Sequence, residues 1–360
     1  MRFLVLFIAL LSLTGCSPKE QPSKVTGDSR TTDAPDPLFV GQQMNTDAPL
    51  TTIALGSCNR QDEPQKMWPF VLDKSPDLWI WLGDNIYGDT EDMSVMLEKY
   101  RMQKFGEAYT ALRNQTQVIG IWDDHDYGVN DGGKEYPMRD TSKALMLDFL
   151  DVPKDAAVRQ RPGGYQAYTF GPAGQKTKII LLDTRYFRDP LDKSPEKGRR
   201  YLPNTEGDIL GEAQWSWLEE QLNNSDAQVH IIGSSIQILS AEHGYEKWAN
   251  FPKSRQRLFD LLQETQPART VLLSGDRHIS ELSKIDLEQL DYPLYELTSS
   301  GMTHTWSRVG DEPNQYRVSD LIAKLAYGLI RIDWSEEEPV ITLEVNGLEG
   351  HNYLTRELPL

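Results

Sequence analysis

Short apolar runs alternate with amphipathic stretches from residue 51 onward. The runs are often β-branched and are bounded by Gly, Asp or Ser, which is typical of buried strands. We expect strands at Thr51–Leu55, Leu78–Leu82, Val118–Trp122, Ile179–Leu182, Val229–Ile232 and Val271–Leu273. Helical spacing occurs at Lys66–Asp73, Met93–Phe105, Ser142–Leu150, Glu212–Asn223 and Arg255–Glu264. This βαβα order predicts one α/β domain, closed by an antiparallel pair at Leu329–Asp333 and Val340–Val345.

The N-terminus indicates export. Arg2 precedes an almost wholly apolar run from Phe3 to Leu13, which is too short to span a bilayer. The run ends in Leu13-Thr14-Gly15-Cys16, which resembles a bacterial lipobox, where the cysteine receives a diacylglycerol. We expect a lipoprotein signal peptide over 1–15, and a protein lipid-anchored to the cell envelope through Cys16. In a Gram-negative cell this is the outer membrane or periplasm; an ordinary signal peptide with an accidental cysteine is the alternative.

The segment 16–50 is rich in Pro, Ser, Thr, Asp and Gln and has few large apolar side chains. This composition predicts a disordered linker between the acylated cysteine and the domain at 51–360. The net charge of −17 leaves no surplus of Lys and Arg, so we expect no binding to a nucleic-acid duplex. A phosphate substrate remains compatible with this charge, because bound cations dominate the local field. The oligomeric state is left open.

Polar clusters directly follow five of the six expected strands. They are Gly56-Ser57-Cys58-Asn59-Arg60, Gly83-Asp84-Asn85-Ile86-Tyr87-Gly88-Asp89, Asp123-Asp124-His125-Asp126, Asp183-Thr184-Arg185 and Gly275-Asp276-Arg277-His278. In open α/β sheets, ligands bind beyond the carboxyl ends of the strands. We therefore expect these clusters to meet in one site.

Several of these residue types favour metal binding. Asp84 and Tyr87 lie three apart across a glycine-flanked turn, where a carboxylate can bridge two metals and a phenolate suits Fe3+. A turn with a packed tyrosine is the alternative. Cys58 is the only cysteine besides Cys16, so acylation of Cys16 leaves it without an intramolecular disulfide partner. We expect a thiolate ligand at Cys58, against the alternative of a small buried hydrophobe.

The third and sixth strands are followed by acid–imidazole clusters. The carboxylates around His125 repel one another, and a cation is the simplest remedy, with a solvated acidic turn as the alternative. His125 could ligate, orient substrate or protonate the leaving oxygen. Asp276 and His278 lie two apart, so an extended backbone places both on one face. They form either a ligand pair or a structural hydrogen bond.

Arginines and further histidines complete the set of candidates. Arg60, Arg185 and Arg277 each lie within a cluster, and a guanidinium offers a fork to phosphate oxygens. We favour Arg185 slightly, although any of the three could pair with a ligand carboxylate instead. His243 could belong to the rim of the site. No comparable signal marks His230, His304 and His351.

Taken together, the motifs resemble the alkaline phosphatase D family of metallophosphatases, over roughly residues 50 to 345. The matching pieces are Gly56-Ser57-Cys58, Gly83–Asp89, Trp122–Gly128, Leu182-Asp183-Thr184-Arg185 and Ser274–His278. The resemblance implies a four-layer α/β/β/α metallophosphatase sandwich with iron (Fe3+) and calcium (Ca2+) as cofactors. Gly-Asp-x-x-Tyr is also similar to the purple acid phosphatases. Long members of the family carry an extra N-terminal domain, whose place the linker takes here.

The resemblance also implies roles for individual residues. By analogy, Asp84 bridges the metals, Cys58 and Tyr87 bind the ferric ion, and Asp276 completes its shell. Asp124 takes the place of an asparagine ligand of the second metal, and His125 lies beside the substrate. His278 is either a ligand or a phosphate contact. The expected catalytic residues are therefore His125, Arg185 and His278.

The expected function is metal-dependent hydrolysis of phosphate esters, in which a metal-activated hydroxide attacks phosphorus in line. An arginine stabilises the equatorial oxygens, and His125 or His278 assists the leaving alkoxide. Monoesters and diesters are not separated, and the anchor makes a phospholipase-like diesterase on membrane lipids a further candidate. A non-catalytic calcium-binding surface lipoprotein is the alternative class, although calcium sites use oxygen ligands rather than thiolates. The sequence lacks the Gly-x-Ser-x-Gly elbow of serine esterases.

Overall fold

The computed structural model describes residues 37–307, 309–310 and 312–359. The expected signal peptide, Cys16 and the first part of the expected linker lie outside these residues. Six strands form sheet A: β1 (Thr52–Gly56), β2 (Leu78–Leu82), β3 (Gln117–Ile121), β12 (Ala326–Asp333), β13 (Val340–Gly347) and β14 (Asn352–Glu357). Six others form sheet B: β4 (Gln166–Phe170), β5 (Thr177–Leu181), β8 (Val229–Gly233), β9 (Thr270–Ser274), β10 (Ser280–Ile285) and β11 (Leu294–Ser299).

The helices and one hairpin lie between these strands in the sequence. The helices are α1 (Trp68–Leu72), α2 (Met93–Lys104), α3 (Glu107–Arg113), α4 (Asp124–Tyr127), α5 (Arg139–Phe149), α6 (Gly211–Asn223) and α7 (Pro252–Thr265). A small hairpin consists of β6 (Asp192–Lys193) and β7 (Tyr201–Leu202). Among the described residues, no helix has the length and apolar character needed to cross a membrane.

In sheet A the parallel strands lie on one side and the antiparallel strands on the other, whereas sheet B has a parallel centre between two antiparallel edge strands. Sheet A has the order β14-β13-β12-β1-β2-β3, and β1, β2 and β3 run parallel. Sheet B has the order β10-β11-β9-β8-β5-β4, and β11, β9, β8 and β5 run parallel. Parallel strands end at a common edge, so the loops after them gather there. This arrangement puts the predicted polar clusters on one rim of each sheet.

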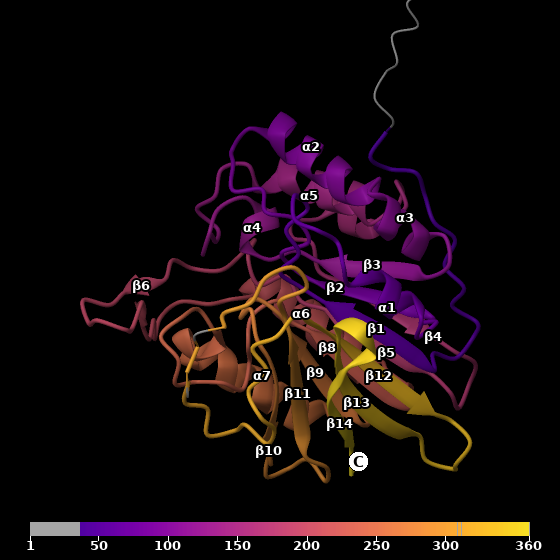
Figure 1. The fold of residues 1–360 in the computed structure, drawn as a ribbon. Helices are drawn as coiled ribbons and strands as arrows, with labels where there is room; N and C mark the ends of the chain where they lie inside the picture. Colours follow the sequence, from indigo (N-terminus) through magenta and orange to yellow (C-terminus); the bar gives the residue numbers. More distant parts are fainter. Residues whose placement is uncertain (1–36, 308, 311, 360) are drawn as a thin grey trace, which may run out of the picture. The chain divides into compact units, whose positions relative to one another are not determined.

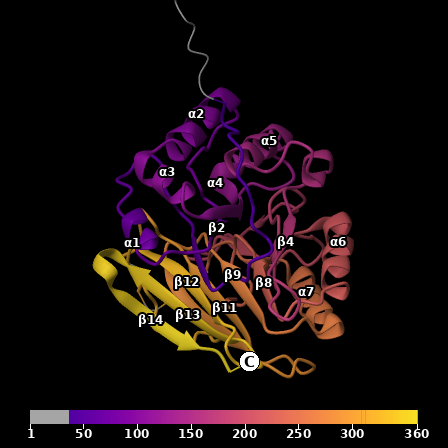
Figure 2. The ribbon, with the colours of Figure 1, turned by 90° about the vertical axis from the view of Figure 1, so that its right-hand side faces the viewer.

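The two sheets pack face to face between two layers of helices, as Figures 1 and 2 show. In sheet B, Ile180 belongs to the core with α6 and α7, while its neighbours Ile179 and Leu181 belong to the core shared with sheet A. Alternate residues of a strand point to opposite faces, so sheet B is buried on both sides. The far face of sheet A is covered by helices α1, α2, α3 and α5, where Trp68 packs edge-on against Trp79, 4.9 Å between ring centres. The expected order of four layers matches this packing.

The six predicted strands and the closing antiparallel pair are confirmed, with ends shifted by a few residues. The five predicted helices are also present. Sequence patterns missed helices α3 and α4 and strands β4, β6, β7, β10, β11 and β14. Strand β11 matters most among these, because its carboxyl end also reaches the rim of the parallel strands.

Residues 38–50, which we call the N-terminal strap, lie along the domain instead of forming part of a disordered linker. Gln42 Nε2 donates to the carbonyl oxygens of Val118 (2.5 Å) and Leu150 (3.0 Å), and Gln42 Oε1 accepts from Val118 N–H (3.0 Å). Thr46 C=O accepts from Gly171 N–H at 2.8 Å. The linker expected over 16–50 is therefore wrong for this part. Polar groups hold it, which an apolar pattern does not reveal.

A buried ion cluster anchors the start of the strap to the helices; we call it the Asp151 cluster. Asp151 Oδ1 accepts from Val40 N–H, Gly41 N–H and Lys104 Nζ, each at 2.8 Å. Its Oδ2 accepts from Arg113 Nη2 at 2.6 Å. Burial lowers the pKa of Lys104 to about 8, although Asp151 acts in the opposite direction. Both carboxylate oxygens of Asp151 therefore have partners.

Candidate metal centre

Two glycines allow the polar loops of the rim to approach closely. A Cβ on Gly83, which has φ +91°, would lie 2.4 Å from the Cβ of Asp123. A Cβ on Gly275 would lie 2.5 Å from Ser57 Oγ. Real Cβ atoms do not come so near, so both positions need glycine. The first contact joins the loops after β2 and β3, and the second joins the loops of the two sheets.

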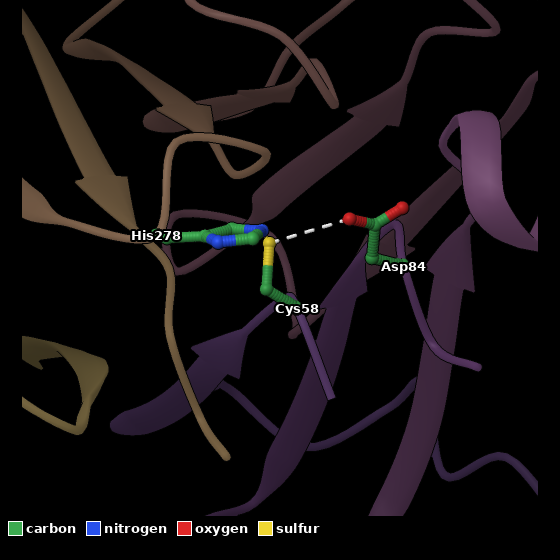
Figure 3. A group of neighbouring side chains, drawn as sticks. All are labelled: Cys58, Asp84 and His278. Atoms are coloured by element: carbon green, nitrogen blue, oxygen red, sulfur yellow. Dashed lines mark hydrogen bonds between the residues drawn. The ribbon is translucent and has the colours of Figure 1, made fainter. Parts of the chain in front are cut away.

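Cys58 lies at the floor of the site, between the sheets. Its Sγ lies 3.3 Å from Asp84 Oδ2 and accepts a hydrogen bond from Ser300 Oγ at 2.9 Å. Figure 3 shows the sulfur pointing towards the Asp84 carboxylate, with the His278 ring alongside. Donor atoms of Cys58, Asp84 and His278 all lie within 4.8 Å of one another. Burial, followed by the charge of Asp276, raises the pKa of the thiol to about 12.

The Tyr87 hydroxyl lies above this group. It donates to Asp84 Oδ2 at 3.2 Å and lies 3.1 Å from Nε2 of both His278 and His304. His304 had no sequence signal, because it follows β11, the strand that the apolar pattern missed. Burial lowers the pKa of His278 to about 3, so the ring is neutral and able to ligate. The predicted candidates Cys58, Asp84, Tyr87 and His278 are thus brought together.

Four carboxylates form a second group beside the first. Oxygen atoms of Asp84, Asp123, Asp124 and Asp276 lie within 4.8 Å of one another. Burial raises the pKa of Asp84 and Asp123 well above the usual range and that of Asp276 to about 7. In Asp124 the pKa falls to about 2, because His125 and Arg185 outweigh burial. Asp123 was predicted to lie in the site, as part of the acidic run after β3, but not as a metal ligand.

Asp84 belongs to both groups, so it is placed to bridge two cations. The carboxylate of Asp276 belongs to the second, acidic group, whereas the main-chain oxygen of Asp276 lies 3.4 Å from Cys58 Sγ. Asp124 Oδ1, Asp123 Oδ2 and His278 Nδ1 are buried without a hydrogen-bond partner among the described residues. Buried polar atoms are rarely left unpaired, and bound cations would satisfy these. The donor set therefore fits metal ions.

The backbone supports the same interpretation. Cys58, Asp84, Asp276 and His278 all adopt left-handed conformations, with φ of 56°, 50°, 60° and 56°. For residues other than glycine this costs about 1–3 kcal/mol each, and it persists where function or packing imposes it. Four of the six predicted metal ligands share this conformation. The strain thus falls on the residues whose donors converge.

His125 lies at the opening of the site. Its Nδ1 lies 2.7 Å and 2.9 Å from the two oxygens of Asp89, and its ring stacks on Tyr87 at 4.2 Å. Burial opposes the charged form, but Asp124, Asp84 and Asp89 together raise the pKa of His125 to about 11. With Asp124, Asp276 and His278 it lines a cavity of about 90 Å³. We call this the metal-side cavity.

Arg185 does not reach that cavity, which corrects its predicted role as a phosphate clamp. Its side chain is fully buried; Nε donates to Asp123 Oδ1 and Nη1 to Glu246 Oε2, both at 2.6 Å. It therefore positions Asp123 from behind. Of the other two arginines, Arg277 pairs with Glu312 at 2.7 Å, while Arg60 is 44% exposed and lies 5.2 Å from the Tyr87 ring centre.

A further acidic group, Asp124, Asp131 and Glu246, is less suited to a metal. Arg185 and Arg188 pair with Glu246, and Arg200 pairs with Asp131 at 3.3 Å. These guanidinium groups already neutralise the acids. We therefore place the candidate metal centre at the first two groups.

Comparison with known proteins agrees with this geometry. The family described as PhoD-like phosphatase matches residues 53–322. Alkaline phosphatase D from Bacillus subtilis (strain 168) is 22% identical over 293 residues, which are 70% of this chain and 49% of that protein. The chain thus spans about half the length of this curated relative.

Solved structures show the same fold. One titled "Structure of PhoD" has a TM-score of 0.61 and 17% identity, covering 88% of this chain and 72% of the other. GAP50 of Plasmodium, described as the anchor in the inner membrane complex, has a TM-score of 0.57 and 12% identity, covering 86% and 89%. The family match extends over most of the sheets and includes every predicted metal ligand. This chain belongs to the PhoD-like phosphatase family.

Proposed function

We propose that this protein hydrolyses phosphate esters at a centre of two cations that share Asp84. One observation carries the proposal: buried carboxylates, a thiol, a phenol and imidazoles converge, and some of their buried polar atoms have no hydrogen-bond partner among the described residues. Metal ions in such sites act as Lewis acids, activate water and neutralise the charge of the phosphate. Family membership agrees with this chemistry.

The side chains suggest which metal each group would hold. Cys58 and Tyr87 supply the thiolate and phenolate that favour a ferric ion, with Asp84 and His278 beside them. Asp124 and Asp276 supply hard carboxylate oxygens beside Asp84, which suit Ca2+. We propose Fe3+ in the first group and Ca2+ in the second.

The chain's own residues would bind and protonate the substrate. Asp89 holds His125 through Nδ1, which leaves Nε2 as the ring atom able to donate a proton to the leaving oxygen. In the metal-free protein the acids around His125 raise its pKa to about 11, which favours a protonated ring. Arg277 lines the metal-side cavity, whereas Arg60 and Arg185 do not, so Arg277 is the better candidate for a phosphate contact.

Elemental analysis combined with activity assays tests this proposal. Chelation should abolish hydrolysis of p-nitrophenyl phosphate, and reloading with iron and calcium should restore it. Parallel assays on bis(p-nitrophenyl) phosphate and on phosphatidylcholine vesicles separate a monoesterase from a diesterase and from a phospholipase-like diesterase. A metal-loaded protein that hydrolyses none of the three would favour a non-catalytic calcium-binding surface protein instead.

Replacement of the thiol tests the ferric assignment. Cys58→Ser should lower the iron content and remove the thiolate part of any visible absorption, because the hydroxyl is a weaker ligand for iron. Full iron retention in Cys58→Ser would show that Cys58 is a buried core residue and not an iron ligand.

We also propose that the protein is exported and lipid-anchored to the cell envelope through Cys16. The support is the apolar run and lipobox of residues 1–16. Cys16→Ala should abolish incorporation of labelled palmitate and release the protein from the membrane fraction. Normal labelling in this variant would refute the anchor.

A further inference from the structure

An open groove of about 610 Å³ lies beside the metal centre. The β6–β7 hairpin, which Figure 1 shows extending from the body, contributes Lys193, Arg199 and Arg200 to its lining. Tyr245 and Trp306 contribute two aromatic rings. The groove therefore combines cations with half-buried rings.

The groove adjoins the metal-side cavity. Arg200, Tyr245 and Trp306 line both spaces. Ring contacts lead outward: the ring centres of His278 and Trp306 are 6.0 Å apart, and those of Trp306 and Tyr245 are 4.5 Å apart. Arg200 Cζ then lies 5.3 Å from the Tyr245 ring centre. A substrate whose phosphate enters the cavity would extend into this groove.

The lining is positive although the chain is strongly acidic. Three cations face one carboxylate, Glu196, in a protein of net charge −17. Arg199 donates through Nε to the carbonyl oxygen of Tyr201 at 3.1 Å. Within the described part of the chain, neither Lys193 nor Arg199 pairs with a carboxylate. Their charges thus remain available to an anion.

Exposed cations on a hairpin are often only solvated, but this hairpin is fixed to the body. Arg200 N–H donates to Gly244 C=O at 2.7 Å, and Tyr201 OH donates to Asp131 Oδ2 at 2.5 Å. Asp131 N–H in turn donates to Asp124 Oδ2 at 2.7 Å, next to the metal centre. The hairpin is thereby attached to the body beside the metal centre at Arg200 and Tyr201.

We propose that this groove binds the part of the substrate beyond the scissile phosphate, and that it prefers a substrate with both a planar ring and a second phosphate, as in a nucleoside bisphosphate. Trp306 and Tyr245 would contact the ring, because aromatic faces stack on bases. Arg199 and Lys193 would pair with the second phosphate. The inference rests on the proposed phosphoesterase function and adds a substrate class to it.

Three substrates separate the contributions: glycerol phosphate, adenosine 5′-monophosphate and adenosine 3′,5′-bisphosphate. In the metal-loaded enzyme we expect kcat/KM to rise about tenfold with the ring, through stacking, and about tenfold again with the second phosphate, through charge-assisted contacts. The second step should shrink as ionic strength rises, because the hairpin cations are exposed and screened.

Variants assign each step to its residues. In the double variant Lys193→Gln/Arg199→Gln, kcat/KM for adenosine bisphosphate should fall close to kcat/KM for adenosine monophosphate. In Trp306→Leu, kcat/KM for adenosine monophosphate should fall close to kcat/KM for glycerol phosphate. Lys197→Gln is the matched control, because Lys197 lies on the same hairpin outside the groove lining; it should leave both ratios and the rate unchanged.

The outcomes keep the inference apart from the proposed function. Equal kcat/KM for all three substrates in the wild type would refute the proposed substrate preference of the groove. So would kcat/KM ratios that the two groove variants leave unchanged. Neither result would contradict the proposed phosphoesterase function. Failure of the metal-loaded enzyme to hydrolyse even glycerol phosphate would overturn the proposed function itself.

Discussion

Two buried acidic clusters of this protein have opposite electrostatic balances. In the Asp151 cluster, Lys104, Arg113 and two backbone N–H groups satisfy both oxygens of one carboxylate. At the candidate metal centre, four carboxylates converge on one another. Arg185 and His125 supply only part of the positive charge needed, and within the described part of the chain two buried oxygens, Asp123 Oδ2 and Asp124 Oδ1, have no hydrogen-bond partner.

Asp151 is fully paired and stabilises the fold, whereas the acids of the candidate metal centre lack sufficient cationic partners and are suited to bind a ligand. A buried charge is stable only when it is paired, so unpaired acids shift their pKa upward or bind a cation. Burial raises the pKa of Asp84 and Asp276 in this way. Balance of charge, more than burial itself, therefore distinguishes the functional cluster from the structural one.

The strongest test of this comparison is Asp84→Asn. It should lower kcat by about 10²–10³-fold, because it removes an electrostatic contact on which the reaction depends. In the metal-free protein the same change should raise the unfolding midpoint, since it relieves the repulsion between Asp84 and the neighbouring buried acids. Steady-state kinetics and thermal unfolding measure both effects. Unchanged kcat would refute the bridging role of Asp84.

The same substitution in the other cluster should have the opposite signature. Asp151→Asn should lower the free energy of unfolding by about 3–5 kcal/mol, because Lys104 and Arg113 lose their counter-ion. Metal content and kcat per folded molecule should not change. Urea titration with elemental analysis distinguishes the cases, and a loss of bound metal would contradict the separation of the two clusters.

Arg185→Lys tests whether Arg185 supports metal binding or contacts the substrate. A lysine reaches only one of Asp123 and Glu246, so we expect a stability loss of about 2 kcal/mol and weaker metal binding. KM in the fully metal-loaded enzyme should stay the same, because Arg185 does not line the cavity. Calorimetric metal titration and KM measurements check this. An increased KM with normal metal affinity would restore Arg185 as a substrate contact.

Gln42→Ala should have the smallest effect. It leaves the N–H of Val118 and two carbonyl groups without their partner, at a cost of about 1–2 kcal/mol in the free energy of unfolding. Activity should be retained. Gln43→Ala is the control, since its exposed neighbouring side chain should contribute little. Equal stability of the two variants would show that the strap adds nothing to the fold.

The sequence predicts the site where apolar strands end in polar loops. Cys58, Asp84, Asp124 and Asp276 each follow such a strand, and the parallel topology brings them together. His304 could not be found in this way, because β11 carries the buried Glu296 in its interior and does not appear as an apolar run. That carboxylate accepts from the N–H groups of Ile238 and Leu239, a pairing visible only in the fold.

Pairing partners also escape sequence patterns. Arg185 follows β5 as the other candidates follow their strands, yet Glu246 and Asp123 hold it behind the site. The strap was missed for a similar reason, since Gln42 holds it through backbone groups of Val118 and Leu150. Local composition describes which side chains are present, whereas these contacts depend on residues far along the chain.

The strap has a mechanical consequence. It runs along β3 and reaches the end of β4, which are the outermost strands of their sheets on one side. Tension applied from the N-terminal side would load the Asp151 and Gln42 contacts before any β-ladder, so the strap should peel away first. Single-molecule pulling through residue 37 would then record a small early rupture ahead of the main unfolding event. Detachment of the strap would expose the lateral edge of β3, where another extended chain could pair.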